Sequence, residues 1–162
     1  GGPAGPAQPG AGPVPPLGSA AAPLRRARIF PVLDSDLANG RAPALVQVRI
    51  EGPVLLLMGP IGLFFARFSR YLQGCGIPVT KVLFPLHEFG FPQQLCVPFR
   101  EPMEAWRPFL RQLLQERGIR HIFMYGDFII PHRIAIEEAQ ALGIEAWVFE
   151  LGYLRQIGRA HV

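Results

Sequence analysis

The sequence of 162 residues contains few cysteines, few charged residues and no long apolar run. Its two cysteines, Cys75 and Cys96, fit neither a CxxC motif nor a metal-ligand spacing, so a disulfide framework is excluded and a reducing compartment is expected. The longest uncharged apolar stretch, residues 52–66, is interrupted by Gly59-Pro60 and is too short to span a bilayer. These absences indicate a globular domain that folds around an ordinary apolar core.

The sequence also lacks the common binding fingerprints. It has no G-x-G-x-x-G, no P-loop lysine and no HExxH, which leaves dinucleotide, ATP-phosphate and metal sites unsupported, and no cofactor is expected. Basic residues exceed acidic ones by only 16 to 12 and are scattered along the chain. A nucleic-acid partner is therefore not expected, because it would require a dense basic stripe with interleaved aromatics.

The two ends of the chain differ from the middle. Residues 1–24 carry no charge and hold 13 of the 36 glycines and prolines, so we expect residues 1–43 to be a low-complexity, mostly disordered segment that is not a signal peptide. Residues 157–162 match the translation of a common sequencing adapter, and we expect the natural protein to continue beyond residue 156. The domain is thus expected over residues 44–156.

Apolar runs and helical stripes alternate through this domain. Strands are expected over residues 44–50, 54–58, 79–84, 119–125 and 146–149, helices over residues 62–73, 102–118 and 131–143, and an irregular connection over residues 85–98. Strands that alternate with helices of this length favour parallel pairing through right-handed crossovers. The fold class predicted is α/β, a Rossmann-like, doubly wound parallel sheet.

Ligands of such sheets bind beyond the carboxyl ends of the strands. Asp127 follows one expected strand and Glu150 ends the next, which would place two carboxylates at one rim, as sugar chemistry needs. The structural alternative is that Asp127 caps the following helix and Glu150 pairs with an arginine. The residues alone favour this alternative.

Other residues at the same rim each allow a functional and a structural interpretation. The turn Gly59-Pro60-Ile61-Gly62 offers amides to an anion or a sugar hydroxyl, or is merely a tight turn. His132 at a helix start and Arg155 are candidate donors to a phosphate or an acidic sugar, or ordinary surface charges. Glu88 in the long connection is a weaker acid/base candidate.

Four segments in order then resemble the N-terminal half of the KpsS/LipB-type capsule polysaccharide biosynthesis and export family. They are VLLLMGPIGLFF (residues 54–65), YGDFIIPHRIAI (125–136), ALGIEAWVFE (141–150) and ELGYLR (150–155). The family pattern is approximately LLLQGPxGPFF, GDxRPxH and EEGYLRP. This chain departs from it at Met58 and Leu151, within residues 128–130, and between residues 83 and 90, where the family's Gly-Gly-Asp is missing.

The resemblance implies one half of a GT-B-like, two-domain glycosyltransferase that moves 3-deoxy-manno-octulosonic acid (Kdo) from CMP-Kdo to a lipid acceptor. CMP-Kdo would bind the missing half, so this fragment alone is expected to be inactive. The implied setting is cytoplasmic and peripheral to the Gram-negative inner membrane, with other capsule assembly proteins as possible partners. The matching residues are Asp127, Glu150 and His132 as catalytic candidates, and Gly59, Pro60, Gly62, Gly126, Gly152, Tyr153 and Arg155 as binding candidates.

Two alternative functions stay open. The first is a non-catalytic carbohydrate-binding or export accessory module that uses the same rim of the sheet. The second is a generic α/β nucleotide-binding domain of another pathway. Activity that survives loss of Asp127 or Glu150 would favour the first, and tight CMP binding by this chain alone would favour the second.

Overall fold

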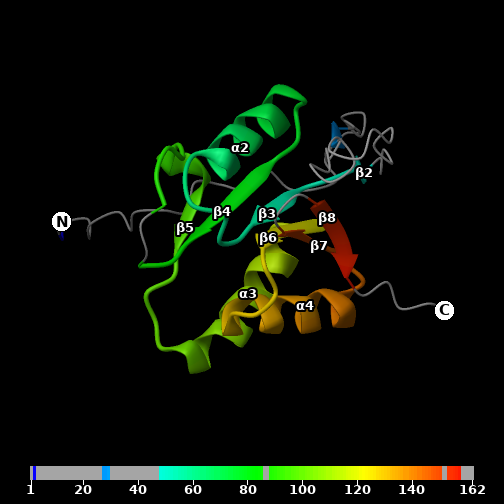
Figure 1. Ribbon diagram of the computed structural model, residues 1–162. Helices are drawn as coiled ribbons and strands as arrows, with labels where there is room; N and C mark the ends of the chain where they lie inside the picture. Colours follow the sequence, from blue (N-terminus) through cyan, green and yellow to red (C-terminus); the bar gives the residue numbers. More distant parts are fainter. Residues whose placement is uncertain (1, 3–26, 30–47, 86–87, 151–152, 158–162) are drawn as a thin grey trace.

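The computed structural model describes residue 2 and residues 27–29, 48–85, 88–150 and 153–157. Two short strands, β1 (Ala27–Ile29) and β2 (Val48–Ile50), pair antiparallel in a small sheet. A larger six-stranded sheet has the order β5-β4-β3-β6-β7-β8 (Figure 1). Its strands are β3 (Val54–Leu56), β4 (Val79–Leu83), β5 (Cys96–Pro98), β6 (His121–Tyr125), β7 (Glu145–Glu150) and β8 (Tyr153–Ile157).

The order of the strands shows that the sheet is doubly wound. The chain runs outward from β3 through β4 to β5, returns to place β6 beside β3, and then runs outward the other way to β7 and β8. All neighbouring pairs are parallel except β7 and β8, which are antiparallel. The predicted α/β class is therefore confirmed, and strand order reverses between β3 and β6.

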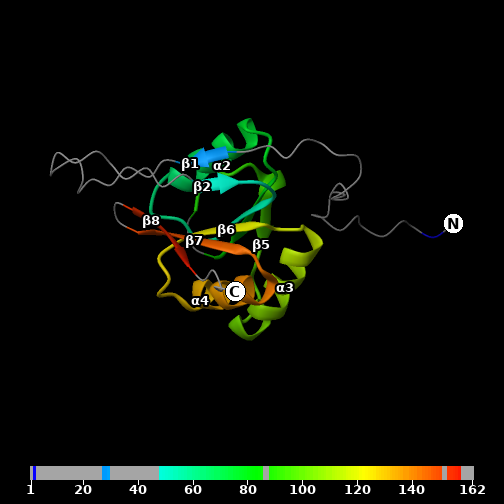
Figure 2. The same cartoon turned by 90° about the vertical axis from the view of Figure 1, so that its right-hand side faces the viewer.

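Helices cover both faces of this sheet. Helix α2 (Phe64–Gly74) lies on one face, and α3 (Trp106–Glu116) and α4 (Ile130–Leu142) lie on the other, as Figure 1 and the perpendicular view in Figure 2 show. Right-handed crossovers require this arrangement, because the chain moves in opposite directions on the two sides of β3. In the part of the chain that the structure describes, no helix is both long and apolar enough to cross a bilayer.

Alternation along the strands divides the core into two clusters. On β3, Val54 and Leu56 pack with the α2 cluster, whereas Leu55 and the following Leu57 pack with the α3 and α4 cluster. Successive side chains of a strand point to opposite faces, so a strand between two helical layers must be apolar throughout. This explains why the sequence reads here as a continuous apolar run.

Both edges of the large sheet are strands that the sequence did not predict. Residues 96–98 form β5 after a 3₁₀ turn, η1 (Gln93–Leu95), and pair with residues 81–83 of β4. At the other edge β8 turns back along β7, with Glu150 opposite Tyr153. The predicted irregular connection over residues 85–98 was wrong at residues 96–98, because a strand of three residues shows no periodicity. No strand was predicted over residues 153–157, because β8 follows β7 almost directly. β8 ends at Ile157, the first of the adapter-like residues.

Candidate functional site

The reversal point between β3 and β6 is where a doubly wound sheet leaves a crevice for ligands. The turn after β3 contains Gly59, Pro60 and Gly62, and the turn after β6 contains Gly126 and Asp127. The predicted candidates from these two turns therefore meet at the carboxyl edge of the sheet. The side chains that fix the two turns determine what this edge offers to a substrate.

Lys81 and Glu88 hold the turn after β3. The Lys81 ammonium donates to the Leu57 carbonyl oxygen at 2.5 Å and lies 2.5 Å from Oε2 of Glu88. The other carboxylate oxygen, Oε1, accepts the backbone N–H of Gly59 at 2.8 Å. Lys81 is fully buried, and burial lowers its pKa although Glu88 opposes the shift. The Gly59 amide, predicted as a group free for a substrate, is thus bound to Glu88.

His132 joins the turns after β3 and β6. Its Nε2 atom accepts the backbone N–H of Met58 at 3.2 Å, so Nδ1 carries the proton and donates to the Gly126 carbonyl oxygen at 2.8 Å. The side chain is completely buried. Burial lowers the pKa of His132 to about 4. Both ring nitrogens are engaged by backbone, so the imidazole is a neutral connector beneath the site.

Glycine is required at two positions in these turns. A Cβ atom at Gly59 would lie 2.6 Å from Cγ of Phe65, too close for any side chain to remain in place. Gly126 has a φ of +71°, and a Cβ atom there would lie 2.5 Å from the Phe128 ring. Close approach and left-handed backbone therefore explain both glycines without a substrate.

The two predicted catalytic carboxylates do come together, through Arg155 of β8. Its Nη2 atom donates to Oδ2 of Asp127 at 2.9 Å and to Oε1 of Glu150 at 2.5 Å. The pKa of Arg155 is raised by the hydrogen bond to Glu150 and then by that to Asp127. Asp127 and Arg155 are each 41% exposed and Glu150 is 24% exposed, so solvent or a ligand reaches the cluster.

The sequence also allowed purely structural roles for these carboxylates, as a helix cap for Asp127 and as an arginine partner for Glu150. The N-cap residue of α4 is Ile129, which makes no side-chain capping bond, so the reading of Asp127 as a helix cap is wrong. Glu150 does pair with an arginine. Ion pairing and sugar chemistry are compatible, because both require charged groups at one rim. The catalytic assignment stays a prediction.

Two helix N-termini open at the same edge. Helices α2 and α4 follow β3 and β6, and neither has a side-chain cap or an acidic residue in its first turn. The positive ends of their helix dipoles favour an anionic group. A phosphate or a sugar carboxylate fits this polarity.

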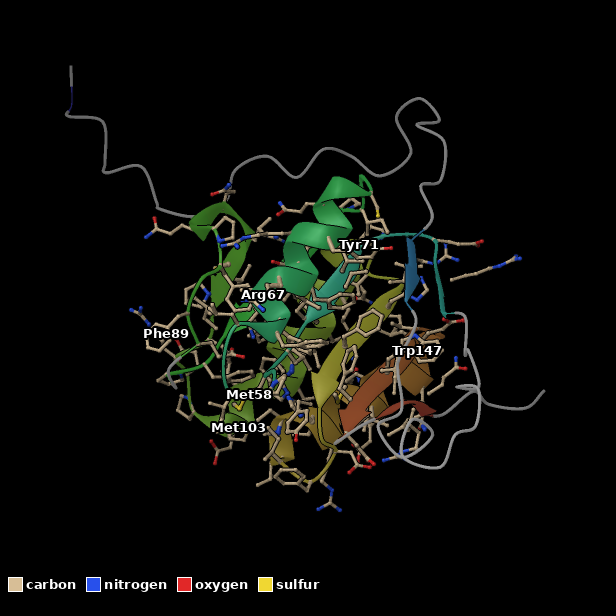
Figure 3. All side chains as sticks on the ribbon, turned by 45° about the horizontal axis from the view of Figure 1, so that its top comes forward. Met58, Arg67, Tyr71, Phe89, Met103 and Trp147 are labelled. Atoms are coloured by element: carbon tan, nitrogen blue, oxygen red, sulfur yellow. The ribbon has the colours of Figure 1, made fainter. Side chains whose placement is uncertain are left out.

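Exposed apolar side chains lie at the same edge. The large apolar residues that are exposed just after β3, β4 and β6 are Ile61, Leu63, Phe64, Phe89, Phe128 and Ile130. Figure 3 shows Phe89 at the outer margin of the molecule and Met58 further in. A cavity of about 400 Å³ beside them is lined by Phe89, Phe91, Gln93 and Arg100, among others. This edge thus combines charge, aromatic faces and apolar surface.

The remaining predicted residues are only partly described. Gly152 lies outside the described residues, and Tyr153 is described as the first residue of β8 without its side chain. Gly62 has a φ of +107° and no atom near its missing Cβ, so it borders open space. Among the described residues, no group of three His, Cys, Asp or Glu side chains is placed to hold a metal ion.

Sequence reasoning missed Lys81. One signal was available, because Lys81 is the only lysine in a chain that otherwise uses arginine, and it interrupts an apolar strand. Glu88 was singled out, but as an acid/base candidate rather than as the partner of this lysine.

Comparison with known proteins finds similar sequences over part of the chain. The chain is 32% identical over 105 residues to the capsule polysaccharide modification protein LipB of Neisseria meningitidis serogroups A and B, a match that covers 63% of this chain and 25% of LipB. It is 32% identical over 103 residues to the capsule polysaccharide export protein KpsS of Escherichia coli, a match that covers 62% of this chain and 26% of KpsS. No family model and no solved structure matches the chain. The chain spans about a quarter of the length of these relatives.

Proposed function

We propose that this chain, a divergent relative of the KpsS/LipB-type capsule proteins, is part of a protein that acts in capsule polysaccharide biosynthesis or export. Support comes from the names of its relatives and from motifs that coincide with the carboxyl edge of the sheet. The finer proposal is transfer of Kdo from CMP-Kdo to a lipid acceptor by a protein of the relatives' full length that contains this chain.

One observation carries the finer proposal, which is that Asp127 and Glu150 share Arg155 at the strand-reversal edge. In sugar transfer one carboxyl group stabilises or attacks the anomeric centre and another handles a proton. Arg155 contacts both carboxylates through Nη2, and its planar guanidinium carries further N–H groups. Those donors suit the carboxylate of an acidic sugar.

His132 takes a different role in this proposal from the one the motif suggests. Its imidazole is buried, neutral at pH 7, and hydrogen-bonded to backbone at both nitrogens. A general acid or base must reach the proton that it transfers. We therefore assign proton transfer to Asp127 or Glu150, and to His132 the positioning of the two turns.

The apolar border of the crevice supports a lipid-linked acceptor. Phe64 at the start of α2, Phe89 after β4 and Phe128 after β6 are exposed at the edge that carries the carboxylates. Large exposed apolar groups gathered at one edge are typical of interaction surfaces. An acceptor that presents a polar head to Asp127 and Glu150 would place its acyl part along this border. Peripheral contact with the cytoplasmic face of the inner membrane is part of the proposal.

The test uses a full-length protein that contains this chain, assayed for Kdo transfer from CMP-Kdo to phosphatidylglycerol. We expect Asp127→Asn or Glu150→Gln to lower kcat by roughly 10²–10⁴-fold, the usual contribution of a general acid or base. The control is Glu101→Gln, an exposed carboxylate in a neighbouring loop, which should leave kcat unchanged. Full activity in both site variants would refute the carboxylate assignment.

A second candidate is a non-catalytic carbohydrate-binding or export role, which the name of the KpsS relative favours. A folded, complete protein without any transfer activity would support it. Tight CMP binding by this chain alone would instead favour a generic nucleotide-binding domain, because the transferase proposal assigns CMP to another part of the protein.

A further inference from the structure

The only lysine of the chain lies buried beside the candidate site. We infer that Lys81 and Glu88 are positioning residues, which together fix the backbone of residues 57–59 in the shape that the site requires. Their effect on turnover rests on the proposed function, whereas their effect on the backbone does not.

The need for such residues follows from where the strand ladders stop. On the β6 side, backbone hydrogen bonds continue past β3, since Leu57 donates to Phe123 and Met58 accepts from Tyr125. On the β4 side, pairing ends at Leu56 opposite Lys81. The Leu57 carbonyl and the Gly59 amide thus lie beyond the last paired residue, where buried polar groups still need partners.

Lys81 and Glu88 supply these two partners. The Lys81 ammonium donates to the Leu57 carbonyl, and one Glu88 oxygen accepts from the Gly59 amide while the other pairs with Lys81. The Lys81 nitrogen also lies 5.1 Å from the centre of the Phe91 ring, which covers it. The two side chains act as one connected bridge between the carbonyl and the amide.

Burial of this pair argues for a geometric role. Taking a lysine and a glutamate out of water is costly, and apolar residues of similar size often serve stability as well or better. Burial also lowers the pKa of Lys81 despite the nearby carboxylate, which shows that desolvation outweighs the attraction. What an apolar pair cannot provide is a donor for Leu57 and an acceptor for Gly59.

The first test measures amide hydrogen exchange by NMR on the chain itself. The variants are Lys81→Met with Glu88→Leu, which replaces the pair by apolar side chains, and Glu88→Gln, which keeps an acceptor for Gly59. We expect the Gly59 amide to exchange roughly tenfold or more faster in the double variant, as for loss of a hydrogen bond to a charged group. Glu88→Gln should restore most of the protection, and the Phe123 amide serves as the internal control.

The second test compares turnover in the full-length protein that contains this chain. The double variant should lose roughly tenfold or more in kcat for Kdo transfer, while its resistance to urea stays near that of the parent. Parental Gly59 exchange in a folded double variant would overturn the inference. So would the same faster exchange at Gly59 and Phe123, since that would mean general loosening.

The two proposals fail separately. If the parent protein itself transfers no Kdo, the transferase proposal is refuted. Faster Gly59 exchange in the double variant would still support the positioning role. Should the double variant not fold, the single variants Glu88→Gln and Glu88→Leu decide, because a positioning role requires the Gly59 amide to stay protected in the first and to lose protection in the second.

Discussion

At the scale of single residues, His132 shows how a motif residue can serve the backbone of a site. It is fully buried in α4, yet it connects the turns after β3 and β6 by accepting from Met58 and donating to Gly126. Removing a buried partner leaves unsatisfied polar groups, which costs about 1–3 kcal/mol. Motif position alone cannot distinguish this role from catalysis.

The titration of His132 predicts a loss of stability in acid. In the unfolded chain His132 takes up a proton as the pH falls below its ordinary pKa of 6.5, whereas in the folded protein it does so only at its lowered pKa of about 4. The free energy of unfolding is therefore highest above pH 6.5. It falls as the pH drops from 6.5 to about 4, by roughly 3 kcal/mol in all. Urea unfolding at pH 7 and pH 4.5 measures this loss.

Measuring His132→Gln shows how much of this loss of stability in acid comes from His132. We expect this variant to be less stable at pH 7 and to lose less between pH 7 and pH 4.5. Burial also lowers the pKa of His121, so His121→Gln is measured in parallel. An acid loss unchanged in His132→Gln would contradict the prediction.

At the scale of elements, α3 and α4 are joined along their length by polar contacts as well as by the core. Trp106 at the start of α3 donates from its indole nitrogen to the Pro131 carbonyl at 3.0 Å. Glu138 of α4 accepts from Arg107 and Arg111 at 2.8–2.9 Å. Helix α4 begins directly after the turn that carries Asp127, so its packing against α3 supports that turn.

Neighbouring glutamates on α4 test this contact. The Glu138 side chain is 2% exposed and its pKa is lowered, first by the hydrogen bond from Arg111, whereas Glu137 is 59% exposed and pairs with Arg107 at the surface. We expect Glu138→Gln to lower the free energy of unfolding by about 1–2 kcal/mol at pH 7. Glu137→Gln should change it by less than about 0.5 kcal/mol, as for an exposed pair.

The pH dependence gives a further check. A carboxyl group whose pKa is lowered on folding stabilises above its ordinary pKa and loses that effect as the pH falls through the lower value. The difference between Glu138→Gln and the parent should therefore shrink in acid. Thermal unfolding followed by circular dichroism measures both variants, and equal effects at the two positions would contradict the prediction.

At the scale of the whole molecule, β8 completes both the sheet and the site. Its Leu154 is buried in the α2 cluster, whereas Arg155 bridges the two carboxylates. Neighbouring side chains of one strand point to opposite faces, so a single edge strand contributes to the core and to the rim together. Loss of β8 would thus affect stability and site geometry at once.

Truncation of one β8 side chain tests its place in the core. Leu154→Ala should lower the free energy of unfolding by about 2–3 kcal/mol, the lower part of the usual range for a buried leucine. The control is Gln156→Ala on the same strand, half-buried, for which we expect about 0.5 kcal/mol or less. Denaturant unfolding measures both, and equal effects would mean that β8 does not pack as described.

Much of the fold was predictable from the sequence. Apolar runs alternating with amphipathic helices predict a doubly wound parallel sheet, because buried parallel strands need apolar residues on both faces. The adjacency of Asp127 and Glu150 followed from the same logic, since carboxyl ends of parallel strands share an edge. Motifs around these residues also predicted the family resemblance, which the LipB and KpsS matches confirm.

The strands β5 and β8 were not predictable in the same way. A strand of three residues has no measurable period, and an edge strand that pairs antiparallel with its predecessor reads as a continuation of the loop. An arginine partner for Glu150 was predicted, but the sequence did not show that this arginine is Arg155 of β8 or that it also binds Asp127.

The sequence by itself determined the layers, the class of sheet and the edge at which polar groups gather, because these follow from periodicity along the chain. Only the tertiary structure decided which polar groups meet. Lys81 with the Leu57 carbonyl, His132 with the backbone of Met58 and Arg155 with Asp127 join residues far apart in sequence. The first two contacts form where the strand ladders end and buried groups need partners, and the third forms where β8 brings its arginine to the rim. No local pattern encodes these positions.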